Sequence, residues 1–192
     1  MGVINLLPFN TNQMLWIGVS DFEDYYQKIS TNVTSEKLSS RVNNNIGGLL
    51  EVLSGEFAFA TNSASLSQVM NNSWLVAGVR DKENANKIFK LIDVSTGNNK
   101  ESQYNGYKIR QIKDEKFISG LFGKAFSTIK SNYYTFITDY IIFANSESSL
   151  INLINFVETG KTLDLNDNYK DFSDNISTNS NLLLYFKPKD IL

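Results

Sequence analysis

Acidic side chains offer this sequence its best route to chemistry, because its 192 residues include neither histidine nor cysteine. Two groups are close enough in sequence to act as a paired acid and base. The first group is Asp21, Glu23 and Asp24, and the second is Asp81 and Glu83. Both groups stand where an apolar strand gives way to a helix, and the helix dipole stabilises negative charge at a helix N-terminus. We therefore interpret them as capping residues and predict that the protein is not an enzyme.

A second pattern, Asp164-x-Asn166-x-Asn168, matches the first three ligand positions of a calcium loop. The match ends there, because Tyr169 stands where the loop needs glycine and Asn175 where it needs a bidentate glutamate. We expect a linker whose side chains cap the following helix. Without cysteine or histidine the commonest transition-metal ligands are also missing, and we predict neither a metal nor another cofactor.

Surface tyrosines are the remaining candidates, because an aromatic ring with a polar tip suits a binding surface. The candidate residues are Tyr25, Tyr26, Tyr133 and Tyr134. Tyr133 and Tyr134 are neighbours on a predicted strand, so their rings point to opposite faces, and at least one is solvent-facing unless both faces are covered. The polar loops Asn62–Ser73 and Ser95–Asn105, or one face of the sheet, are the other surfaces we expect to meet a partner.

Charge and hydropathy narrow the choice of partner. The net charge is −2, from 18 basic and 20 acidic residues, and no basic run is longer than two residues. We therefore predict no nucleic-acid partner. The longest apolar runs have about five residues, against the roughly 20 that a membrane span needs, so we expect any membrane association to depend on an anchor outside this sequence.

Short apolar runs that lead into helix caps set the order of the elements. These are Gln13–Val19 before a helix over Asp21–Ile29 capped by Ser20, Trp74–Val79 before a helix over Asp81–Ile92, and Tyr140–Asn145 before a helix from Ser146 to Gly160. Further strands are predicted over Glu56–Thr61, Tyr107–Lys113, Tyr133–Ile137 and Leu182–Phe186. Further helices are predicted over Leu38–Leu53, ended by Gly55, and over Lys116–Ile129 and Tyr169–Ile176.

Helices and strands interleave, but hairpins occur twice, so the predicted fold class is α+β. We expect a mixed, largely antiparallel sheet of about seven strands with helices packed on it. The segments Glu56–Ile92 and Tyr133–Val157 share the order strand, strand, capped helix, which favours a degenerate internal repeat as much as it favours a common unit. We expect a single domain over residues 1–192, cut from a longer protein, with residues 1–100 and 101–192 as its halves.

Several short motifs resemble a family of bacterial extracytoplasmic proteins, the domain of unknown function 3352. They are Leu7-Pro8-x-x-Thr11, Leu53-Ser54-Gly55-Glu56, Tyr104-x-Gly106-x-x-Ile109, the run from Thr138 to Ser146, and Gly160-x-Thr162-Leu163 ahead of Tyr169-x-x-Phe172. The resemblance implies an exported or membrane-anchored envelope protein and carries no catalytic residue. We predict a non-enzymatic binding or scaffold module of the periplasm or cell surface with a protein or glycan partner, the alternative being a small-ligand or glycan-binding domain.

Overall fold

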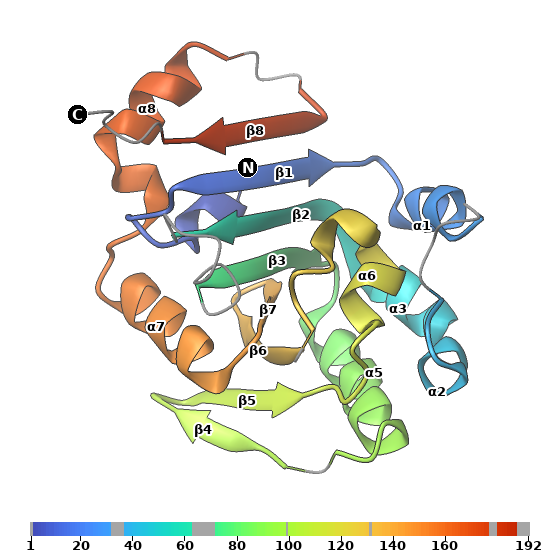
Figure 1. Ribbon diagram of the computed structural model, residues 1–192. Helices are drawn as coiled ribbons and strands as arrows, with labels where there is room; N and C mark the ends of the chain where they lie inside the picture. Colours follow the sequence, from blue (N-terminus) through green and yellow to red (C-terminus); the bar gives the residue numbers. More distant parts are fainter. Residues whose placement is uncertain are drawn as a thin grey trace.

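A single antiparallel sheet lies between two layers of helices in the computed structural model (Figure 1). The structure describes residues 2–31, 37–62, 72–98, 100–130, 132–176 and 180–187. Strands and helices interleave along the chain as expected, and the α+β prediction is confirmed.

Within the described residues the sheet has eight strands, one more than predicted. They are β1 (Gln13–Gly18), β2 (Leu53–Thr61), β3 (Ser73–Val79), β4 (Ser102–Tyr104), β5 (Tyr107–Gln111), β6 (Tyr133–Ile137), β7 (Tyr140–Ala144) and β8 (Leu182–Phe186). Their spatial order is β4-β5-β6-β7-β3-β2-β1-β8, and every neighbouring pair is antiparallel. The additional strand is β4, which falls within the segment Ser95–Asn105 that we predicted to be a loop.

The two faces of the sheet are covered by different helices. On the α5 face lie α1 (Phe22–Ser30), α2 (Ser40–Asn43), α3 (Ile46–Val52), α5 (Lys82–Ser95), α6 (Phe117–Phe122) and the 3₁₀ turn η2 (Lys124–Phe126). On the α7 face lie α7 (Glu147–Glu158), α8 (Asp167–Asp174) and the 3₁₀ turns η1 (Val3–Asn5) and η3 (Leu163–Leu165). All seven residues of β3 are buried, because this central strand is covered on both sides.

Phenylalanine is the most frequent residue in the core of the α5 face. The ring of Phe57 on β2 packs against those of Phe22, Phe122 and Phe126, with centroids 5.3 to 5.8 Å apart. The α7 face is tied together by polar contacts as well. Glu56 accepts hydrogen bonds from the indole Nε1 of Trp16 at 3.1 Å, the hydroxyl of Tyr140 at 2.7 Å and the backbone amide of Gly2 at 3.0 Å. One carboxylate therefore joins β1, β2, β7 and the start of the described chain.

Helix caps follow the predicted pattern with one correction. Asp81 caps α5 and Ser146 caps α7 by accepting backbone amide hydrogen bonds. Helix α1 is capped by Asp21, whose carboxylate accepts from the amides of Glu23 and Asp24, and not by Ser20 as predicted.

Two predicted helices are shorter than their apolar spacing suggested. The helix over Leu38–Leu53 is split into α2 and α3 at Asn44 and Asn45, since asparagine favours helix interiors poorly. Gly55 does not end a helix: it lies in β2, where a Cβ atom would stand 1.8 Å from the carbonyl oxygen of Val19. The helix over Lys116–Ile129 stops at Gly123, which has a φ of 102° that other residues rarely adopt.

The two strand-strand-helix units adjoin each other through β3 and β7. Their order along the chain is as predicted, but α5 packs on one face of the sheet and α7 on the other. A two-fold axis between two antiparallel strands would keep both helices on the same face, so such an axis does not relate the two units.

Candidate binding sites at the two edges of the sheet

An exposed apolar strip runs along β8, the last strand at one edge of the sheet. Leu182, Leu184 and Phe186 are 62%, 63% and 62% exposed. Leu182 pairs with Ile17 of β1 and Leu184 pairs with Leu15, and both β1 residues are half-buried on the same face. We call these five residues the β8 strip.

The backbone of β8 is also open along its outer side. Asn181 accepts a hydrogen bond from the amide of Gly18, and the amide of Lys187 donates to Asn12. In an antiparallel pair the bonded residues alternate, so the odd-numbered residues of β8 bond to β1. The amides and carbonyls of Leu182, Leu184 and Phe186 therefore point away from the sheet, and no described strand pairs with them.

Helices cover only one face of β8. On the α7 face, the ring of Tyr185 lies 5.4 Å from that of Tyr169 and 5.2 Å from that of Phe172 on α8. On the α5 face, α1 packs mainly against β2, α3 and α6. The β8 strip is thus the part of the α5 face that the described helices leave bare (Figure 1).

A shallow hollow of about 270 Å³ adjoins the β8 strip at the end nearest α1. Ile17, Tyr25 and Asn181 are among the residues that line it. The Tyr25 hydroxyl donates to the carbonyl oxygen of Phe122 at 2.6 Å, and burial raises the Tyr25 pKa to about 12. Tyr26 is half-buried against the α5-face core, and burial raises its pKa too.

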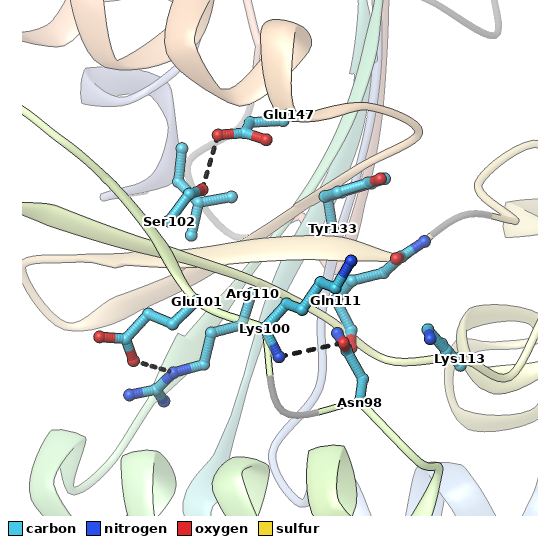
Figure 2. A pocket seen from close by; sticks show the side chains of 10 residues that line it. Asn98, Lys100, Glu101, Ser102, Arg110, Gln111, Lys113, Tyr133 and Glu147 are labelled. Atoms are coloured by element: carbon cyan, nitrogen blue, oxygen red, sulfur yellow. Dashed lines mark hydrogen bonds and ion pairs between the residues drawn. The ribbon is translucent and has the colours of Figure 1, made fainter.

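The opposite edge of the sheet holds a polar pocket of about 610 Å³, the β5 pocket (Figure 2). It is lined by Asn98, Lys100, Glu101, Ser102, Ile109, Arg110, Gln111, Lys113, Tyr133 and Glu147. Glu101 lies 2.7 Å from Arg110 Nε and 3.0 Å from Lys108 Nζ, so two cations hold one acid. The Ser102 hydroxyl donates to Glu147 Oε1 at 2.6 Å, which links β4 to the first turn of α7.

Asn98 fixes the segment that forms one wall of the β5 pocket. Its side-chain amide donates to the carbonyl oxygen of Gln111 at 2.5 Å, and its side-chain oxygen accepts from the amide of Lys100 at 3.2 Å. Ser95–Asn105, one of our predicted partner-binding loops, therefore supplies much of the pocket. The other such loop, Asn62–Ser73, lies largely outside the described residues.

A buried carboxyl group, that of Asp93 on α5, lines a small cavity of about 120 Å³ next to the β5 pocket. Asp93 is only 5% exposed, and its Oδ2 accepts a hydrogen bond from the Tyr134 hydroxyl at 2.6 Å. Its Oδ1 has no hydrogen-bond partner among the described residues. Burial raises the pKa of Asp93 to about 7, although the Tyr134 hydrogen bond and the Arg110 charge oppose the rise.

The tyrosines that we predicted to be at the surface lie in different environments. Tyr133 is half-buried and lines the β5 pocket. Tyr134 is only 1% exposed, so its prediction as a partner-binding residue was wrong: the α5 face is covered at β6, and the ring packs against Phe89. Tyr25 adjoins the β8 strip. The four tyrosines thus do not form one surface.

Sequence reasoning missed the exposed side chains of β8. The run Leu182–Phe186 is apolar throughout, which is typical of a strand covered on both faces, and no residue in it signals exposure. It also missed Lys100 and Lys113, because isolated lysines in polar segments are common on any protein surface.

The acidic residues that we interpreted as structural have structural contacts. Asp21 and Asp81 cap helices, as described above. Asn166 caps α8 by accepting from the amide of Tyr169 at 3.2 Å, and Asp164 accepts from the hydroxyl of Thr162 at 2.5 Å. The capping interpretation of the Asp164–Asn168 segment is therefore confirmed.

Comparison with known protein families agrees with the resemblance noted in the sequence. A family model described as "Protein of unknown function (DUF3352)" matches residues 28–191. The chain belongs to the DUF3352 family. No curated protein and no solved structure matches this DUF3352 domain. Among the described residues, none of its helices has both the length and the apolar character that crossing a bilayer requires.

Proposed function

We propose that this DUF3352 domain is a non-enzymatic binding module that docks a protein partner along the β8 strip. The observation that carries the proposal is the combination of exposed apolar side chains and outward-facing backbone on the same three residues. Leu182, Leu184 and Phe186 supply both.

The chemistry of the edge defines the partner. A strand added beside β8 would satisfy its outer amides and carbonyls, and alternate side chains of that strand would cover the apolar residues. We therefore expect an extended segment with large apolar residues at every second position. Natural proteins usually protect open edges with charge, proline or a short strand, and Leu182–Phe186 contains no charged residue and no proline.

Location in the bacterial cell envelope is the second part of the proposal. It is supported by the resemblance to extracytoplasmic proteins and by membership of the DUF3352 family. A scaffold that assembles envelope proteins needs an adhesive edge and no catalytic group, which agrees with the capping roles of Asp21 and Asp81.

The test selects peptides from a random display library on the wild-type domain, with counter-selection on the Leu184→Lys variant. Enriched peptides should alternate apolar and polar residues and should protect the amides of Leu182, Leu184 and Phe186 from hydrogen exchange. Sedimentation of the domain alone, measured first, shows whether a second copy of the chain takes this place.

A matched control is Leu91→Lys. Leu91 is 56% exposed and lies on α5, which is far from β8 in the structure (Figure 1). Leu184→Lys should lower the affinity of the domain for the selected peptides at least tenfold. Leu91→Lys should leave this affinity unchanged. Peptides that bind both variants equally, or that protect amides elsewhere, would show that the β8 strip is not the docking site.

A further inference from the structure

Some charged groups of the β5 pocket form ion pairs or hydrogen bonds with other side chains, and others form no ion pair among the described residues. Glu101 is held by Arg110 and Lys108, and Glu147 accepts a hydrogen bond from Ser102. By contrast, neither Lys100 nor Lys113 forms an ion pair with any acid in the described part of the chain. Two ammonium groups in the pocket lining are therefore outside the ion pairs of the described residues, in a protein whose net charge is −2.

Glu147 and Lys113 lie on different sides of the pocket, apart from the ion pair of Glu101 with Arg110. Figure 2 shows Ser102 and Glu147 on one side and Lys113 on the other, with Lys100 between them. A carboxylate has about four lone-pair positions in its two oxygens, and Ser102 uses one of those of Glu147. The remaining positions suit hydroxyl donors of a ligand, while the lysines suit an anionic group.

The pocket lining also includes apolar groups. Ile109 and the half-buried ring of Tyr133 both line it. An aromatic face next to hydrogen-bonding groups matches a sugar ring, which has C–H faces and hydroxyl edges. The cavity volume of about 610 Å³ lies within the range of roughly 300 to 1,000 Å³ that is usual for small-ligand sites.

We propose that the β5 pocket binds a sugar that carries a carboxylate or phosphate group. The anionic group lies between Lys100 and Lys113, the hydroxyls reach Glu147 and Ser102, and the ring packs against Tyr133. This site is separate from the β8 strip, at the opposite edge of the sheet, and does not depend on the protein partner proposed there.

The test measures binding to the intact domain by calorimetry and by amide chemical shifts at low salt. The probes are glucuronate, glucose 6-phosphate, glucose and inorganic phosphate. At least one of the two acidic sugars should bind at least tenfold more tightly than glucose and inorganic phosphate, with shifts at Lys100, Arg110 and Gln111. The tighter of the two acidic sugars identifies the anionic group.

Variants locate the binding groups. Lys100→Ala and Lys113→Ala should each lower the affinity for the acidic sugar at least fivefold. Tyr133→Ala should lower the affinity for the acidic sugar and leave the affinity for inorganic phosphate unchanged. The matched control is Lys87→Ala, an exposed lysine paired with Glu83 on α5 and absent from the pocket lining. Unfolding midpoints equal to wild type show that each variant is folded.

Three results would overturn the proposal: no binding by either acidic sugar at 10 mM, equal affinity for glucose or inorganic phosphate, or affinities unchanged in the two lysine variants. The Leu184→Lys variant should bind the acidic sugar as well as wild type does. Failure at one edge of the sheet is thus distinguishable from failure at the other.

Discussion

The two edges of the sheet are protected to different degrees. At one edge, β4 is a short strand flanked by the ion pairs of Glu101 with Arg110 and Lys108. At the other edge, β8 has five apolar residues and pairs with only one of the described strands, β1. Charge and short length discourage pairing with another chain, so β4 can border a pocket for a soluble ligand while β8 is suited to pairing. Under the two proposals above, recognition by backbone and recognition by side chains are segregated within one sheet.

The largest expected effect is a difference in the free energy of unfolding between variants on the two faces of β8. Leu183 is 5% exposed and packs in the α7-face core, whereas Leu184 is 63% exposed. Leu183→Ala should lower the free energy of unfolding by about 2 to 4 kcal/mol, because it leaves a cavity. Leu184→Ala should change it by less than about 0.5 kcal/mol. Urea unfolding measures both, and equal losses would mean that both side chains are buried.

The next effect concerns the buried carboxyl behind the β5 pocket. The pKa of Asp93 is raised from 3.8 to about 7 in the folded protein. Between these values the unfolded chain gives up the proton while the folded one keeps it, so this group lowers stability as pH rises from about 4 to 7. Asp93→Asn should remove that slope, so that its free energy of unfolding relative to wild type rises by up to about 4 kcal/mol between pH 4 and pH 8.

Urea unfolding at pH 4 to 8 tests this, with Asp171→Asn on exposed α8 as the control. A slope that is the same in wild type and Asp93→Asn would show that Asp93 is ionised in the folded protein throughout this range.

A third prediction compares amides within β8. Those of Leu182, Leu184 and Phe186 face outward, and those of Leu183 and Tyr185 face β1. In the free protein the outward amides should exchange with solvent at least tenfold faster. Exchange followed by NMR gives each rate, and uniform protection along β8 would reveal a strand or partner that already covers this edge.

The smallest expected effect lies at the ion pairs of the protected edge. Glu101 is partly exposed beside Arg110 and Lys108, and such pairs contribute roughly 0.2 to 1 kcal/mol. Glu101→Gln should destabilise the protein by about 0.5 kcal/mol at low salt and by less at 1 M NaCl, because salt screens the pairs. A salt-independent loss would point to packing as the source of the stabilisation.

The positions of the elements were readable from the sequence, because each depends on local patterns. The cap residues Asp81 and Ser146 and the apolar run Trp74–Val79 placed their strands and helices to within a few residues. Breaks within the predicted helices were harder to predict. Gly123 ended one helix, and Asn44 and Asn45 divided another, where the apolar spacing alone suggested longer helices.

The binding surfaces were less predictable, because exposure depends on where other elements end. Leu184 and Leu183 are identical neighbours in the sequence, and only the position of α1 and α8 decides which of them meets solvent. Tyr134 was misplaced for the same reason. Lys100 was missed because its significance depends on Glu101 being paired with Arg110 from another strand.

The pairing of β8 with β1 joins the first and the last described strands in chain order. During synthesis on a ribosome, β1 can pair with β2 early, but its other side stays open until β8 has emerged. Because such long-range pairing is slow to form, a nascent or truncated chain would expose Leu15 and Ile17 on a different edge. Chaperone dependence and aggregation of folding intermediates should therefore be governed by β1, while the mature domain presents β8.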